Sequence, residues 1–284
     1  IPALIISILV FYWALAIKPE VLSAFVNGMQ DPISTIFAAL TFTNQSWINF
    51  VVFANPPYWS LGYEVMYYLF FGVLFYLRGW KRVTLAALIL IVMGPSITLY
   101  APLWFIGVLT YHQCKKHDAG DRNIRHLTLF VLTTIMIAIL ISPTIVKNIN
   151  QLVINELPTN ALKILMPTAH KFPADYVLAI ALAYNIYFLN ASSKFVEHYF
   201  LRFEKIIKAM AKHTFSLYLF HFPILCLFAI LIDFNTRPYL GAVCAIVFTP
   251  TIIYVLSIYT EDKRVIVRDI IAKKIRKNDS SVKK

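Results

Sequence analysis

Residues 215–232 read FSLYLFHFPILCLFAILI, a run of 18 residues without a single Asp, Glu, Lys or Arg. A run of about 20 apolar residues is long enough to cross a bilayer as a helix. Backbone polar groups in lipid must be satisfied within the protein, and this run lacks the alternation of polar and apolar residues that is typical of barrel strands. This stretch therefore predicts a membrane-spanning α-helix.

The rest of the chain repeats this pattern. Of its 284 residues 59% are hydrophobic and only 14% are charged, whereas soluble domains carry about 25% charged residues. Nine apolar runs are candidate spans, several of them short: residues 2–17, 33–53, 58–77, 83–99, 102–111, 127–141, 174–189, 215–232 and 239–258. We therefore predict an all-α, polytopic integral membrane helix bundle with about eight or nine spans.

Positive charge predicts the orientation. Most of the 26 Lys and Arg residues fall in segments 78–82, 113–126 and 192–212 and after residue 260, and the positive-inside rule places such segments in the cytoplasm. Residues 1–260 are thus predicted to form the membrane domain and residues 261–284 a basic cytoplasmic tail. The net charge of +12 also attracts anionic headgroups, so the expected partners include membrane lipids and no nucleic acid.

The first group of residues that could carry chemistry follows a tryptophan near residue 60. Glu64 lies in an apolar run with no other acidic residue between Asp31 and Asp118. An ionisable group in a span costs about 2.5–3.5 kcal/mol on insertion scales, so its default interpretation is functional. Helical spacing predicts one polar and aromatic face that comprises Trp59, Ser60, Tyr63, Glu64, Tyr67 and Tyr68. The alternative is that Glu64 only joins helices by a hydrogen bond and that the aromatic residues form an interfacial belt.

The second group lies in the stretch that opens this section. Thr214, Tyr218 and His221 share a helical face, and Pro223 deprives the carbonyl of Leu219 of its usual donor. Histidine is the side chain best suited to move protons near pH 7. A structural hydrogen bond is the alternative role for His221, and His213 is expected only to reach toward the cytoplasmic edge of the span.

No metal site is predicted from the sequence. Cys114, Cys226 and Cys244 lack the spacing of metal ligands, and the chain has no His-Glu-x-x-His pattern, Gly-rich phosphate loop or Gly-x-Ser-x-Gly elbow. The templates of soluble enzymes therefore do not apply.

These two stretches, in this order on a polytopic bundle, resemble the membrane acyltransferase 3 family. The similarity rests on Trp59-Ser60-Leu61 with Glu64, and on Ser216, Tyr218, His221 and Pro223. Weaker similarities are Ile1-Pro2-Ala3, Phe105-Ile-Gly107 and Tyr259-Thr-Glu261. Members of this family O-acylate cell-surface polysaccharide and lipopolysaccharide.

The resemblance also implies what this sequence lacks. The family's first span carries an Arg and a His that are regarded as central to catalysis, and no part of this sequence matches them. The start at Ile1-Pro2-Ala3 is similar to the beginning of the family's third span. The resemblance therefore implies an N-terminally truncated chain that holds only part of the active site.

The function expected from these observations is membrane-bound acyl transfer, most simply O-acetylation, to a hydroxyl of an envelope glycan in the bacterial inner membrane. The donor would be acetyl-CoA or another acyl-CoA, without a metal. Glu64 and His221 are the candidate catalytic residues. The candidate substrate-binding residues are Trp59, Ser60, Tyr63, Tyr67, Ser216 and Tyr218.

Two other classes of protein remain open at this point. A transporter or flippase for a small solute or lipid-linked sugar would also place Glu, His and a proline-broken helix in the membrane, although no internal repeat is visible. A structural subunit would use the same polar residues only to hold helices together.

Overall fold

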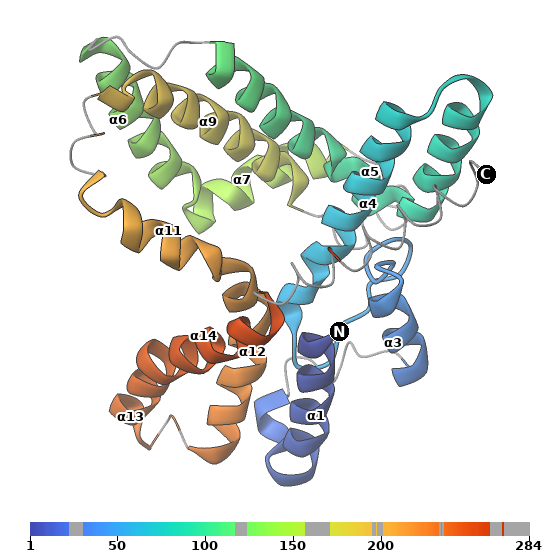
Figure 1. Ribbon diagram of the computed structural model, residues 1–284, viewed down its shortest axis with the longest axis vertical. Coiled ribbons are helices and arrows are strands. Elements are labelled where there is room, and N and C mark those ends of the chain that lie inside the picture. Colours follow the sequence, from blue (N-terminus) through green and yellow to red (C-terminus); the bar gives the residue numbers. More distant parts are fainter. Residues whose placement is uncertain are drawn as a thin grey trace. The chain divides into compact units, whose positions relative to one another are not determined.

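The computed structural model describes residues 1–22, 31–116, 124–156, 171–194, 197, 201–232, 234, 236–261 and 269. Its described residues form helices, turns and irregular segments, and no strand occurs among them. The chain divides into two compact units. Figure 1 labels their helices. One unit comprises Ile1–Leu40, Val51–Trp59 and Lys205–Lys284, and the other comprises Thr41–Phe50 and Ser60–Glu204.

The first unit is centred on the helix that contains most of the apolar run at 215–232. Its elements are α1 (Pro2–Ile17), η1 (Pro19–Leu22), α3 (Pro32–Leu40), η2 (Pro56–Tyr58), α11 (Glu204–Lys212), α12 (Thr214–Leu231), α13 (Pro238–Val243), the π-helical turn η3 (Cys244–Phe248) and α14 (Thr249–Thr260). Helix α12 packs against α1 and α14. The T-shaped pair Phe11 and Phe53, with centroids 5.6 Å apart, packs a residue of α1 against one of the segment before η2. Both side chains are fully buried, so they form part of this unit's core.

The second unit is built around one long helix. Its elements are α4 (Trp59–Tyr76), α5 (Gly79–Lys116), α6 (Ile124–Leu140), α7 (Pro143–Ile154) and α9 (Phe172–Ala191). Helix α9 packs against α5, α6 and α7. A buried cluster of α4 and α5 residues forms its core: Tyr63, Met66, Tyr67, Met93 and Ile97.

Helix α5 breaks at Gly94, where φ is +69° and ψ is 179°. A Cβ atom at this position would lie 2.4 Å from the carbonyl oxygen of Ser46. Glycine is required here because the positive φ and the close approach of the 41–50 segment both exclude a side chain. The break therefore divides the expected run at 83–99, and the part after Gly94 continues as helix through the expected run at 102–111.

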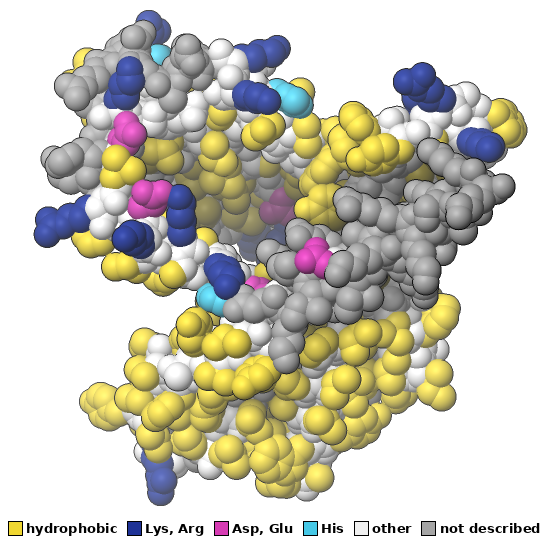
Figure 2. Space-filling model, viewed as in Figure 1, with side chains coloured by type: hydrophobic (Ala, Val, Ile, Leu, Met, Phe, Trp, Pro, Cys, Tyr) yellow, Lys and Arg dark blue, Asp and Glu magenta, His cyan; other side chains and the backbone are white. Residues whose placement is uncertain are grey.

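Among the described residues, four helical stretches are long and apolar enough to cross a membrane: α5, α9, α12 and Pro238–Thr260. A fifth is counted if α6 and α7, which are bent by 77°, form one span. Hydrophobic side chains also cover much of the visible surface (Figure 2). The prediction of an all-α structure is thus confirmed for the described residues, and their long apolar helices are compatible with an integral membrane protein, whereas the predicted count of eight or nine spans is not confirmed.

The difference in span count has identifiable causes. The run at 33–53 is helical only over Pro32–Leu40, and the following residues turn through positive φ angles at Phe42 and Phe53. Helix α4 is not among the candidate spans, and α1 is a shorter apolar helix of 16 residues. Apolar composition alone therefore overestimates the count. The predicted basic tail lies outside the described residues, apart from Glu261 and Asp269.

Candidate functional site

His221 lies on α12 and is held by its own helix. Its Nδ1 atom is 2.9 Å from the carbonyl oxygen of Tyr218 and 3.1 Å from that of Leu217. A carbonyl oxygen can only accept a hydrogen bond, so Nδ1 carries the hydrogen. In the neutral ring Nε2 is then the nitrogen with the lone pair. Because His221 is only half-buried, this arrangement offers a proton acceptor.

Tyr218, one turn before His221, links α12 to the segment that precedes α4. Its hydroxyl donates to the carbonyl oxygen of Pro57 over 2.9 Å, and its ring centroid lies 6.3 Å from that of His221. This contact fixes the Tyr218 ring beside the imidazole.

Pro223 has the effect on the helix that its position predicts. It cannot donate to the carbonyl oxygen of Leu219, and the side-chain Nδ2 of Asn55 donates to that oxygen instead, at 3.1 Å. The same Nδ2 also donates to the hydroxyl of Ser7 over 3.0 Å. The sequence analysis identified the carbonyl that loses its donor. Because the fully buried Asn55 side chain donates to it, this carbonyl is not open to a ligand.

A buried carboxylate lies at the beginning of α12. Oε1 of Glu261, the residue that follows α14, accepts the backbone N–H of Ser216 at 2.7 Å and the Ser216 hydroxyl at 2.9 Å. Both residues are buried. The first amides of a helix lack partners within the helix and favour negative charge. Glu261 therefore joins the end of α14 to the start of α12.

His213 takes part in the same cluster and does not simply extend toward solvent, as the sequence suggested. Its Nδ1 lies 2.8 Å from Oγ of Ser257 and 3.9 Å from Oε2 of Glu261. Because Ser257 donates its own hydrogen to the carbonyl of Tyr254 at 2.6 Å, His213 is the donor to Ser257. The imidazole and the carboxylate thus face each other at the end of this helix pair.

The aromatic face predicted on α4 divides into two. Tyr63 and Tyr67 are buried, whereas Trp59, Glu64 and Tyr68 are exposed. Glu64 accepts a hydrogen bond from the Tyr68 hydroxyl at 3.1 Å. The partner of Glu64 thus lies in its own helix rather than in a neighbouring one, and the carboxylate is not enclosed in the bundle of its unit.

The buried half of this face forms a tyrosine cluster with α5 and α9. The Tyr67 hydroxyl donates to the carbonyl of Ile97 at 2.8 Å, and the rings of Tyr63 and Tyr100 are 5.8 Å apart. Tyr100 in turn donates to Oδ2 of Asp175 at 2.7 Å. This cluster belongs to the buried core of its unit, and the hydroxyls of Tyr67 and Tyr100 are already bonded within the protein.

The predicted site residues are distributed over both units. Residues Trp59, Ser216, Tyr218 and His221 belong to one unit, and residues Ser60, Tyr63, Glu64 and Tyr67 belong to the other. Within the first, Tyr218 and His221 lie together, while Ser216 faces Glu261. Within the second, Tyr63 and Tyr67 lie together, with ring centroids 6.2 Å apart.

The sequence analysis did not name Asn55 and Asp175, and it assigned no role in a site to His213 and Glu261. Two signals were available. Asn55 directly precedes two prolines, and Glu261 lies three residues after the apolar run at 239–258. A polar residue at the edge of a span is the expected donor or acceptor for the backbone of a neighbouring helix.

Among the described residues, no group of three or more His, Cys, Asp or Glu side chains could hold a metal ion. No family model matches the chain, and searches of curated proteins and of solved structures find no match either.

Proposed function

We propose that this protein is an integral membrane O-acyltransferase of the bacterial inner membrane, with its basic tail in the cytoplasm. It would transfer an acyl group, most simply acetyl, from acyl-CoA to a hydroxyl of an envelope glycan such as polysaccharide or lipopolysaccharide. The Trp59-Ser60-Leu61 motif with Glu64, and the motif of Ser216, Tyr218, His221 and Pro223, support this proposal.

The observation that carries the proposal is the orientation of the His221 ring. Two carbonyl oxygens hold Nδ1–H, which leaves Nε2 to accept a proton. A general base of this kind takes the proton of the glycan hydroxyl as its oxygen attacks the thioester carbon. The tetrahedral oxyanion then collapses and the carbon–sulfur bond breaks. Nε2 returns its proton to the sulfur, so CoA leaves as the free thiol and the imidazole is neutral again.

The remaining candidates take supporting roles in this proposal. Trp59 is exposed and offers an aromatic face that suits a sugar ring, and the ring of Tyr218 lies beside His221. Tyr63 and Tyr67 are buried, so they act by supporting α4, whose exposed Glu64 orients the acceptor or passes on its proton. Ser60 is half-buried at the first turn of α4 and offers a hydroxyl to the acceptor. Ser216 already donates its hydroxyl to Glu261, so it acts by positioning the start of α12.

The test is the transfer of label from radioactive acetyl-CoA to envelope glycan, in membranes that carry the complete gene product. We expect His221→Ala to lower the rate about 10²–10⁴-fold, the usual contribution of a general base. The control is His112→Ala, because His112 is an exposed histidine of α5 and its loss should leave the rate unchanged. Glu64→Gln should lower the rate by a smaller factor.

Two results would overturn the proposal at different levels. If His221→Ala and Glu64→Gln both retain full transfer, the residue assignment is wrong while the activity stands. If the glycan stays unmodified with every acyl-CoA offered, and uptake of a solute instead depends on the protein, the transporter interpretation replaces acyl transfer.

A further inference from the structure

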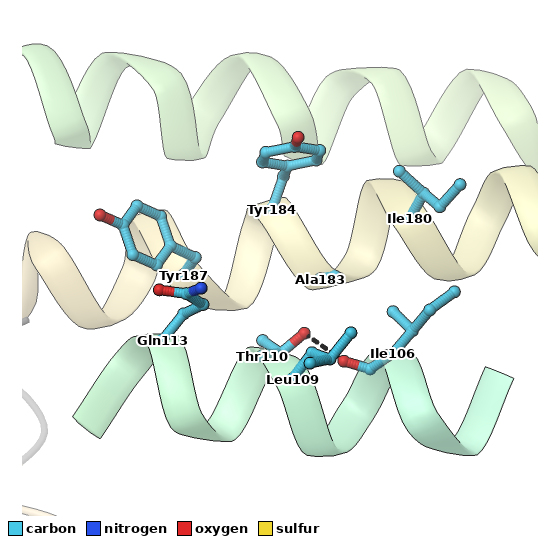
Figure 3. A pocket seen from close by; sticks show the side chains of 8 residues that line it. All are labelled: Ile106, Leu109, Thr110, Gln113, Ile180, Ala183, Tyr184 and Tyr187. Atoms are coloured by element: carbon cyan, nitrogen blue, oxygen red, sulfur yellow. Dashed lines mark hydrogen bonds between the residues drawn. The ribbon is translucent and has the colours of Figure 1, made fainter. Parts of the chain in front are cut away.

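A groove with a volume of about 410 Å³ lies between α5 and α9 of the second unit. Its lining comprises Ile106, Leu109, Thr110 and Gln113 of α5 and Ile180, Ala183, Tyr184 and Tyr187 of α9 (Figure 3). This volume lies within the range of about 300–1,000 Å³ that is typical of ligand pockets. Both helices are candidate membrane spans, so the groove lies in the part of the chain that faces lipid or other spans.

A hydrogen bond between the two helices lies at each end of the groove. At one end Asn190 donates to the carbonyl oxygen of Cys114 over 3.2 Å. At the other end Tyr176 donates to the carbonyl oxygen of Leu99 over 2.6 Å. The lining residues of each helix extend over eight residues, or roughly 10 Å along the axis. The groove is therefore an elongated space, and an interhelical hydrogen bond lies beyond each of its ends.

The middle of the groove is apolar. The hydroxyl of Thr110 donates to the carbonyl of Ile106 within its own helix at 2.7 Å, as Figure 3 shows, so it offers its methyl group rather than a free hydrogen. Ala183, the smallest lining side chain, lies on the side of α9 that faces α5 and leaves room between the helices. A hydrocarbon chain fits such a lining, whereas a sugar or nucleotide would lose its hydration without compensation.

One end of the groove is polar, and positive charge follows it. Gln113 and Tyr187 lie at the same end in Figure 3. Directly beyond Gln113, the last turn of α5 carries Lys115 and Lys116, and Lys194 follows the end of α9. All three lysines are exposed. Basic pockets between spanning helices are typical binding sites for anionic lipid headgroups.

We infer that this groove binds one anionic phospholipid of the bilayer. An acyl chain occupies the apolar space around Ala183, the glycerol ester region reaches Gln113 and Tyr187, and the phosphate group lies among Lys115, Lys116 and Lys194. The inference does not depend on acyl transfer, because neither helix carries His221 or Glu64.

Filling the groove tests the place of the acyl chain. The detergent-solubilised protein is stripped of lipid and titrated with dioleoyl-phosphatidylglycerol, and native mass spectrometry counts the bound molecules. We expect Ala183→Phe to lower the occupancy of the tightest site by at least about tenfold, since the new ring takes the space of the chain. The matched control is Leu182→Phe, because Leu182 is a neighbouring exposed residue of α9 that does not line the groove.

Removing charge tests the place of the headgroup. We expect Lys115→Gln with Lys116→Gln to weaken binding of phosphatidylglycerol about fivefold for each lysine, with no change for dioleoyl-phosphatidylcholine. Lys81→Gln is the control, because Lys81 is an exposed lysine near the opposite end of α5.

Three outcomes would overturn the inference. They are an Ala183→Phe protein that folds and binds phosphatidylglycerol like the wild type, equal affinity of the wild type for the two lipids, and an equal effect of Lys81→Gln and the double substitution. If Ala183→Phe does not fold, Ile180→Phe at the rim of the groove replaces it, with the same expectation.

Discussion

Helix α12 contains the internal proline Pro223 and helix α5 contains Pro95 and Pro102, and the structure compensates for Pro223 and for Pro95 in different ways. Helix α12 continues through Pro223, and one buried side-chain amide, that of Asn55, donates to the freed carbonyl of Leu219. Helix α5 breaks at Gly94, directly before Pro95, and the indole of Trp47 donates to the carbonyl of Ile91 over 2.8 Å. The first solution depends on a single hydrogen-bond donor, and the second depends on the backbone shape of a glycine.

The largest expected effect concerns the glycine of α5. Gly94→Ala should lower the free energy of unfolding by about 3 kcal/mol or more, because a positive φ is unfavourable for Ala and the new Cβ would meet the Ser46 carbonyl at 2.4 Å. Unfolding in mixed detergent micelles, followed by circular dichroism, measures this change.

Gly107 of the same helix provides the control. A Cβ at that position would meet no atom within 4 Å, so Gly107→Ala should be neutral or slightly stabilising, since Ala favours helix more than Gly does. Equal effects of the two substitutions would contradict the view that α5 depends on the shape of Gly94.

The next effect concerns the donor of α12. Asn55→Ala should lower the free energy of unfolding by about 1–3 kcal/mol, because it leaves the buried carbonyl of Leu219 without a partner. In the Pro223→Ala background the backbone N–H of residue 223 can donate to that carbonyl. The cost of Asn55→Ala should therefore fall, and a double-mutant cycle measures the coupling.

The corresponding double-mutant cycle in α5, with Trp47 and Pro95, should give no coupling energy. Pro95→Ala supplies an N–H, but the break at Gly94 directs it away from the carbonyl of Ile91, so Trp47 and Pro95 should show no coupling. A coupling energy in α5 as large as that in α12 would remove the distinction between the two helices.

Part of this comparison was predictable from the sequence. The position of Pro223 identifies Leu219 as the carbonyl that loses its donor, because the rule connects residues four apart in one helix. The replacement donor, Asn55, is 164 residues away in the sequence. Local spacing carries no information about such a contact, so only the folded chain reveals it.

The predicted face on α4 shows a second limit. Its six residues, from Trp59 to Tyr68, extend over about half of the circumference of the helix at 3.6 residues per turn. A neighbouring helix covers a narrower part, so α5 buries Tyr63 and Tyr67 and leaves Glu64 and Tyr68 exposed. The type of helix was predictable, but the edge of its buried face was not.

A smaller effect is expected from the donor of α5. Trp47→Phe removes the hydrogen bond to Ile91, but Trp47 is 58% exposed, so another polar group can reach the carbonyl. We expect a loss below about 1 kcal/mol in the same unfolding measurement. A loss larger than that of Asn55→Ala would show that the indole, and not the backbone at Gly94, maintains the break.

The smallest effect is expected at the start of α3, where Asp31 precedes Pro32. Pro32 needs no replacement donor, because the first amides of a helix have no partner within the helix anyway. Asp31 accepts the backbone N–H of Ser34 at 2.9 Å and its hydroxyl at 3.1 Å, and these bonds lower the pKa of the Asp31 carboxyl below its usual 3.8. The charged carboxylate therefore stabilises the folded state above that pH, and this contribution is lost as the pH falls through the lowered pKa.

Asp31→Asn keeps a capping side chain without a titrating group. The stability of the wild type relative to Asp31→Asn should therefore fall only at acidic pH. A difference that is constant from pH 7 to pH 3 would contradict a charge-dependent cap.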